Sequence, residues 1–178
     1  MYKPIVIATG VIIALGASSA GVAAAKLTDP QIAHIVVTAD DLDIANAKQA
    51  LQKSKNAEVQ RFANRMIAEH GSVTDQAVAL SKKLKITPED NPTSKSLKDA
   101  QDANRAKLDA LSGAAFDKAY ADNEAAYHKV VYDALSNTLI PDAQNAQLKS
   151  LLEDGLKLFQ DHLRDAQNMV KQLNVAHQ

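Results

Sequence analysis

The sequence places four side chains with metal-binding chemistry on the apolar faces of four different predicted helices. They are Asp43, His70, His128 and His162. Each histidine also has a carboxylate within four positions of it in the chain, namely Glu69, Glu124 and Asp161. Helical bundles hold transition metals with histidine nitrogens and carboxylate oxygens from facing helices. Asp43 and the three histidines are therefore candidate ligands of a divalent transition metal. The three neighbouring carboxylates are candidate outer partners that orient the rings.

A structural role accounts for the same pattern. In that interpretation each histidine is partly buried, hydrogen-bonds a neighbouring carboxylate and fixes the register of its helix. The protein would then be a non-catalytic interaction or stress-related module whose histidines are structural or pH-sensitive. The other two histidines carry less information, since His34 lies off the apolar stripe and His177 lies at the C-terminus.

The distances of the candidate ligands from the helix ends argue against one site that uses all four. His128 lies roughly 10 residues before the break predicted at 138–142, and His162 lies roughly 20 residues after it. At ~1.5 Å of rise per residue, the two rings would differ in level by about 10–15 Å. Asp43 and His70 lie about 12 and 14 residues from the turn at 55–56, so they are expected to be level.

The elements that must position these residues are long amphipathic helices. Apolar residues recur every three or four positions over residues 29–54, 57–85, 114–137 and 143–175. Asp29 and Asn56 are the expected N-caps of the first two helices, and Pro30 fits a first helical position. A linker at 87–95 precedes a short helix at 97–111, for which Ser96 and Asp99 have capping-box spacing. No segment alternates as a strand would. The fold class predicted is all-α, an antiparallel four-helix bundle with a short extra helix before the third long one.

Composition excludes several kinds of site. The chain has no cysteine, which excludes disulfides, zinc–thiolate sites, iron–sulfur clusters and a lipoprotein anchor. The formal net charge of −1 gives no electrostatic footprint for nucleic acid. The sequence carries no glycine-rich phosphate loop, nucleophile elbow or complete metal-hydrolase motif, so a binding protein is favoured over an enzyme. It leaves open a protein partner and a homo-oligomer.

Residues 1–25 have the layout of a secretory signal peptide. Lys3 precedes an apolar stretch at residues 5–15, and small residues lead to Ala23-Ala24-Ala25. The stretch is short for a membrane span, which needs ~20 apolar residues. We expect a domain at 26–178 that is periplasmic or secreted, with no transmembrane segment after cleavage. An uncleaved N-terminal segment that tethers the domain to the inner membrane is the alternative.

Several stretches of the chain resemble the DUF4142 family of exported bacterial proteins. They are residues 59–67 followed by Glu69-His70, residues 108–120, His128, and residues 161–163. The resemblance covers nearly all of residues 29–173. It implies a ferritin-like four-helix bundle and no known activity.

The chain departs from this family's pattern and from working ferritins. Asp43 stands where the family usually has Glu, and Tyr127 stands where an acid usually precedes the histidine of the third long helix. The di-iron Glu-x-x-His motif is absent, because Ile67 and Phe159 lie three positions before His70 and His162. The sequence therefore does not support ferroxidase chemistry.

Overall fold

The computed structural model describes residues 25–175, which form helices and no strand. The helices are α1 (Asp29–Lys53), α2 (Ala57–Leu84), α3 (Pro92–Asp109), α4 (Gly113–Ala134), the π-helix η1 (Leu135–Leu139), α5 (Ile140–Asp142) and α6 (Ala146–Val175). The all-α prediction is confirmed. The predicted signal peptide, apart from its last residue, and His177 lie outside the described residues. None of the helices within 25–175 has the length and hydropathy that a membrane crossing requires.

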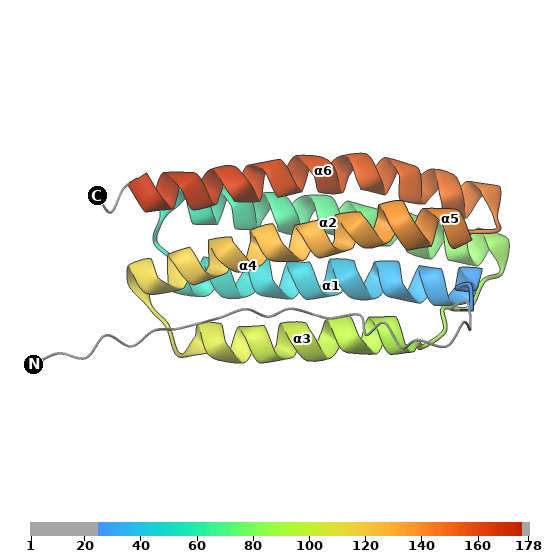
Figure 1. The fold of residues 1–178 in the computed structure, drawn as a ribbon, viewed down its shortest axis with the longest axis horizontal. Coiled ribbons are helices and arrows are strands. Elements are labelled where there is room, and N and C mark those ends of the chain that lie inside the picture. Colours follow the sequence, from blue (N-terminus) through green and yellow to red (C-terminus); the bar gives the residue numbers. More distant parts are fainter. Residues whose placement is uncertain (1–24, 176–178) are drawn as a thin grey trace, which may run out of the picture.

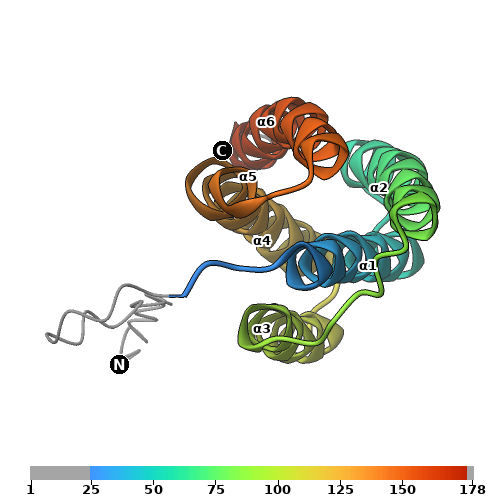
Figure 2. The same cartoon turned by 90° about the vertical axis from the view of Figure 1, so that its right-hand side faces the viewer.

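The four long helices α1, α2, α4 and α6 lie side by side (Figures 1 and 2). Helices α1 and α6 run in one direction and α2 and α4 in the other, because α3 leads the chain back along the bundle between α2 and α4. Helices α1 and α2 form one packed pair, and α4 and α6 form another. The extra helix α3 lies outside these four, against α1. Polar contacts attach it there: the Asn46 amide donates to Gln101 Oε1 at 2.9 Å, and His34 Nδ1 lies 2.9 Å from Ser94 Oγ.

Capping side chains set where the helices begin. Asn56 caps α2 as predicted, since its Oδ1 accepts from the N–H groups of Glu58 and Val59. Thr28, not Asp29, caps α1. Asp29 instead accepts from the backbone N–H groups of Gln144 and Asn145, at 2.8 and 3.0 Å. The carboxylate predicted as a cap therefore ties the start of α1 to the connection before α6.

The extra helix also begins earlier than the sequence indicated. Asn91 caps it in a capping box with Ser94, and Pro92 occupies the first turn, so α3 starts at Pro92 and not near Leu97. An Asn N-cap followed by Pro satisfies the free N–H groups at the start of a helix better than the predicted Ser96–Asp99 pair does.

The break predicted at 138–142 is absent. The helix continues from α4 through η1 and α5 to Asp142, and α6 begins at Ala146. Pro141 has no N–H to donate, and the backbone next to it follows a π-turn in which the N–H of Ile140 bonds to the carbonyl of Leu135. As a result His128 lies 14 residues before Asp142, and His162 lies 16 residues after Ala146. The two rings are therefore at about the same level.

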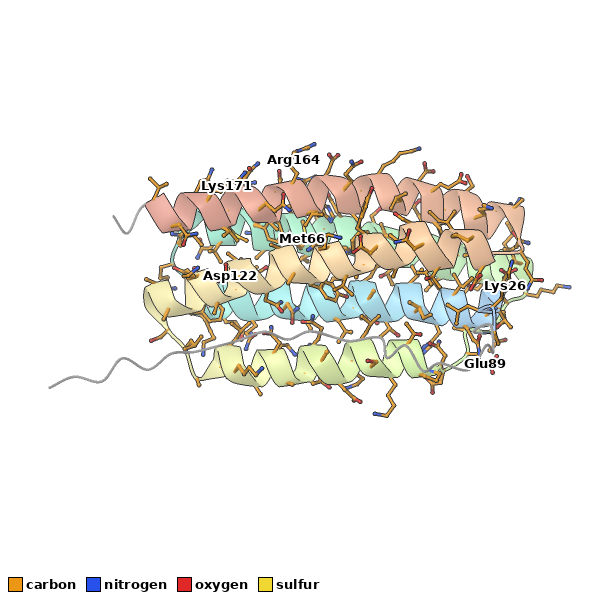
Figure 3. The ribbon with its side chains drawn as sticks, in the orientation of Figure 1. Lys26, Met66, Glu89, Asp122, Arg164 and Lys171 are labelled. Atoms are coloured by element: carbon orange, nitrogen blue, oxygen red, sulfur yellow. The ribbon has the colours of Figure 1, made fainter. Side chains whose placement is uncertain are left out.

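Two apolar clusters fill the interior, one toward each end of the bundle. Phe62, Met66 and Tyr120 belong to one, and Ile35 and Leu152 belong to the other. Figure 3 shows Met66 within the bundle, whereas Arg164 and Lys171 point outward. Buried alanines, among them Ala47, Ala63, Ala121 and Ala166, let the helices approach closely. Each of the four long helices has at least one buried polar residue at the level between the two clusters, and these residues lie together in the middle of the bundle.

We expect Phe62→Ala to lower the free energy of unfolding by about 3–5 kcal/mol, because it empties a fully buried site. The Phe62 ring packs 6.4 Å from the Tyr120 ring and 5.9 Å from the His128 ring, measured between centroids. Val78→Ala, at a site 38% exposed, is the control and should change that energy by only about 0.5 kcal/mol. Urea unfolding followed by circular dichroism measures both. Equal losses in the two variants would contradict this packing.

Candidate metal centre

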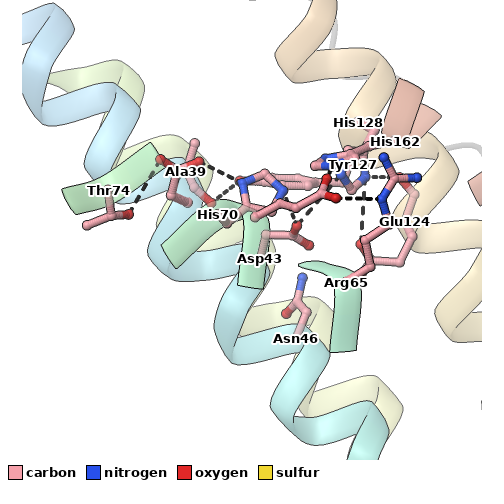
Figure 4. Close-up of polar contacts among 12 residues, drawn as sticks. Ala39, Asp43, Asn46, Arg65, His70, Thr74, Glu124, Tyr127, His128 and His162 are labelled. Carbon is pink, nitrogen blue, oxygen red and sulfur yellow. Dashed lines mark hydrogen bonds and ion pairs between the residues drawn. The ribbon is translucent and has the colours of Figure 1, made fainter. Parts of the chain in front are cut away.

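The four candidate ligands meet in one buried layer of the bundle, together with Glu124 (Figure 4). Asp43 comes from α1, His70 from α2, Glu124 and His128 from α4, and His162 from α6. All five are 0% exposed. This layer lies between the two apolar clusters, so the surrounding protein excludes bulk water from it.

The three rings are mutual neighbours. Their centroids are 5.9 Å apart for His70 and His128, 5.0 Å for His70 and His162, and 5.4 Å for His128 and His162. The level mismatch that we predicted for His128 and His162 is therefore wrong. The π-turn and the later start of α6 remove it.

One nitrogen of each ring is bound to an acceptor on the side away from the other rings. His70 Nδ1 lies 2.7 Å from Asp40 Oδ1, and His162 Nε2 lies 2.5 Å from Glu69 Oε2. His128 Nδ1 lies 2.9 Å from the backbone carbonyl of Glu124. Carboxylate and carbonyl oxygens accept only, so these nitrogens carry the proton, and in a neutral ring the other nitrogen keeps a lone pair.

Within residues 25–175, the other nitrogens of His128 and His162 (Nε2 and Nδ1) have no hydrogen-bond partner, and neither do Asp43 Oδ1 and Glu124 Oε2. The other nitrogen of His70, Nε2, faces Asp43 Oδ2. One ligand atom from each histidine lies within 4.8 Å of the others, and the same holds for Asp43, Glu124 and His128. Asp43 Oδ2 is 2.7 Å from His70 Nε2 and 3.6 Å from His128 Nε2. A buried polar atom with no partner costs about 1–3 kcal/mol, so a convergent set of them fits a cation.

The outer partners differ from those predicted. Glu69 contacts His162 on the facing helix and not its neighbour His70. Arg65 Nε holds Glu69 in turn, at 2.9 Å, and also pairs with Asp165. Asp161 lies outside the layer, partly exposed and 2.8 Å from Arg164, so it orients no ring.

Two residues contribute that the sequence analysis did not assign. Asp40 stands in the acidic run Asp40, Asp41 and Asp43, a pattern typical of a solvated face, yet it is 1% exposed and holds His70. Its spacing of three from Asp43 puts both on one face of α1, which is the signal that could have identified it. Tyr127 donates its hydroxyl to the Ala39 carbonyl at 2.7 Å, which fixes α4 against α1 beside the cluster.

Burial and mutual charge set the protonation of the layer. Burial raises the pKa of Asp43, but His70 and His128 outweigh this and hold that pKa well below its usual range. Burial lowers the pKa of His70, but the Asp43 and Asp40 carboxylates raise it to about 10. Without a metal, His70 is therefore a cation between two acidic groups.

The other members of the layer are neutral. Burial, followed by repulsion from Asp43, raises the pKa of Glu124 well above its usual value. Burial lowers the pKa of His128 and lowers that of His162 to about 4. At neutral pH the last two rings thus hold free lone pairs toward the centre.

The comparison with known families agrees with this architecture. A family described as "Domain of unknown function (DUF4142)" matches residues 14–169. The chain belongs to the DUF4142 family. The resemblance found in the sequence is confirmed, and the match spans the predicted helices from α1 into α6. No curated protein and no solved structure matches the chain. In this DUF4142 protein, the geometry of the cluster is therefore the feature that points to a function.

We expect His162 to stabilise the metal-free DUF4142 domain less as the pH falls from about 6.5 to 4. Its pKa in the folded protein is about 4, against 6.5 for the free side chain, so the unfolded chain takes up the proton first. The difference in unfolding free energy between wild type and His162→Gln should shrink over this window, by at most ~3 kcal/mol.

Urea unfolding in EDTA at several pH values measures this difference. His34→Gln, which removes a partly exposed histidine outside the layer, is the matched control. A difference that grows as the pH falls would contradict a neutral, buried His162.

Proposed function

We propose that this DUF4142 protein binds one divalent transition metal ion through His70, His128, His162 and Asp43. The observation that carries the proposal is the orientation of the rings. Each has its outer nitrogen held by an oxygen acceptor, the inner nitrogens of His128 and His162 make no hydrogen bond, and that of His70 lies 2.7 Å from Asp43 Oδ2. Metal-binding histidines are held in this way, because the outer bond fixes the tautomer and makes the inner nitrogen a better ligand.

The arrangement supports one ion. The two groups of converging ligands, His70–His128–His162 and Asp43–Glu124–His128, share His128. Since His128 Nδ1 is bonded to a carbonyl, only its Nε2 is free to bind a metal. Glu124, which burial keeps protonated, would lie beside the ion as a neutral neighbour or lose its proton and bind.

Three imidazoles and a carboxylate suit Zn²⁺, Cu²⁺, Ni²⁺, Fe²⁺ or Mn²⁺ better than Ca²⁺ or Mg²⁺, which prefer all-oxygen sites. Four protein ligands with no exposed surface close the coordination shell, as structural metal sites do. A binding or stabilising role is therefore proposed in preference to catalysis. The proton that His70 shares with Asp43 would leave when the metal binds, so binding would release a proton.

We further propose that the helices form a ferritin-like bundle. Support comes from four long helices that each send a histidine or carboxylate into a central layer. The layer contains more histidine than a di-iron site, which uses carboxylates from every helix. This composition favours a single nitrogen-rich site over ferroxidase chemistry.

A metal-free role is the second candidate, and the His70 geometry favours it. A protonated His70 between Asp40 and Asp43, both within 2.7 Å, is a complete buried ion network by itself. In that case the domain would be an interaction or stress-related module, and the network would fix the helix register.

Metal content separates the two candidates. Untagged protein, purified without chelator, is expected to contain about one metal ion per chain, measured by inductively coupled plasma mass spectrometry. It should melt higher when metal is added after EDTA treatment, by the linkage of binding to folding. Asp43→Asn and His70→Ala should each lower the metal content at least tenfold, whereas His34→Ala, outside the layer, should not. Metal-free protein whose melting temperature ignores every ion tested would leave only the structural role.

We propose that the domain is exported to the periplasm or secreted, on the basis of the pattern in residues 1–25. Expression of the full chain in a Gram-negative host should then give periplasmic protein that begins near Lys26. Intact-mass measurement of the fractionated protein checks this. Uncleaved protein in the membrane fraction would favour the tethered alternative, and uncleaved cytoplasmic protein would contradict both.

A further inference from the structure

A cavity of about 630 Å³ opens between α1, α3, α4, the η1 segment and α6, with Val73 of α2 also in its lining. Its walls are aliphatic, with Ile35 from α1, Leu97 from α3, Leu135 from η1 and Leu152 from α6. Val130, at its rim, is 43% exposed and is one of three large apolar side chains left exposed in residues 25–175. The volume is within the range of ~300–1,000 Å³ that small-molecule sites occupy.

The charge of the lining restricts what can bind. Among the described residues, Asp40 and Asp133 are the charged ones that line it, and none of its lining residues is a lysine, arginine or histidine. Asp40 is engaged by His70, and Asp133 pairs with Lys129 at 2.5 Å. An anionic head group would find no cation and two carboxylates there, so a carboxylate or phosphate ligand is disfavoured.

A glycine keeps the cavity open. Gly155 lies in the interior of α6 and lines the cavity, and a Cβ at this position would meet nothing within 4 Å. Glycine inside a helix costs about 1 kcal/mol relative to alanine. At this position a larger residue would place its side chain in open space at the cavity lining.

The cavity borders the histidine layer without opening into it. Phe159 lines the cavity, and its ring lies 5.1 Å from His70 and 5.5 Å from His128, between centroids. Asp40 also contacts both, because it lines the cavity and is hydrogen-bonded to His70. A molecule in the cavity would therefore pack against the wall of the metal centre and not against the ion.

We propose that this cavity is a binding site for an uncharged, apolar small molecule. Its size, its mainly aliphatic walls and the lack of cationic groups among the described residues that line it carry the proposal. The proposal does not depend on the metal, because the cavity walls do not include any of the four proposed ligands.

Two fluorescent probes of similar shape and different charge test it. N-phenyl-1-naphthylamine is uncharged, and 8-anilinonaphthalene-1-sulfonate is anionic. The full chain should bind the uncharged probe saturably at about one per chain and at least tenfold more tightly than the sulfonate. Gly155→Leu, which adds a bulky side chain at the cavity lining, should weaken this binding at least tenfold.

Gly71→Leu is the matched control. Gly71 is also a helical glycine with open space at its Cβ, but it does not line the cavity, so binding should persist. The same result is expected in EDTA and with added metal, which separates this test from that of the metal centre. Absence of saturable binding, equal affinity for the sulfonate, or equal loss in both variants would overturn the proposal. So would a change of mass in solution on Gly155→Leu, because the cavity would then be an interface with a second copy.

Discussion

A carboxylate with no exposed surface must be matched by a nearby positive charge, and the rest of this structure follows from that requirement. Asp43 is such a group, at the centre of the bundle. Burying an unpaired charge costs several kcal/mol, which a domain of ordinary stability could not sustain. The matching charge is a proton on His70 or the proposed metal ion. The proton and the proposed ion would occupy the same place between Asp43 and the rings. The hydrogen-bond network that positions the protonated His70 would therefore also position the ligands of the ion.

The apolar stripes predicted which ionisable residues face inward. Asp43, His70, His128 and His162 all lie in the layer because the 3.6-residue period of a helix fixes the direction of each side chain. The partners of these residues could not be predicted in the same way. Glu69 directly precedes His70 in the chain but points about 100° away from it, toward α6. Which helix lies on that side is decided by the tertiary structure.

The level of His128 and His162 was the main error about the site, and Pro141 was its cause. Proline usually ends a helix, so the sequence indicated a break. The structure keeps the helix by taking a π-turn over Leu135–Leu139, which needs no N–H from residue 141 in the regular ladder. Nothing in the local sequence separates these two outcomes, because the choice depends on how well the continued helix packs on α6.

The hydrogen bonds behind two of the rings join different helices. Asp40 on α1 holds a ring of α2, and Glu69 on α2 holds a ring of α6. The centre is thus assembled from residues at both ends of the domain, and it exists only after the last helix has docked. A chain that stops short of α6, or docks it out of register, would lack the third ring and leave Glu69 without its partner on α6. Occupation of the centre would therefore distinguish fully folded molecules from incomplete ones, as a checkpoint at the end of folding.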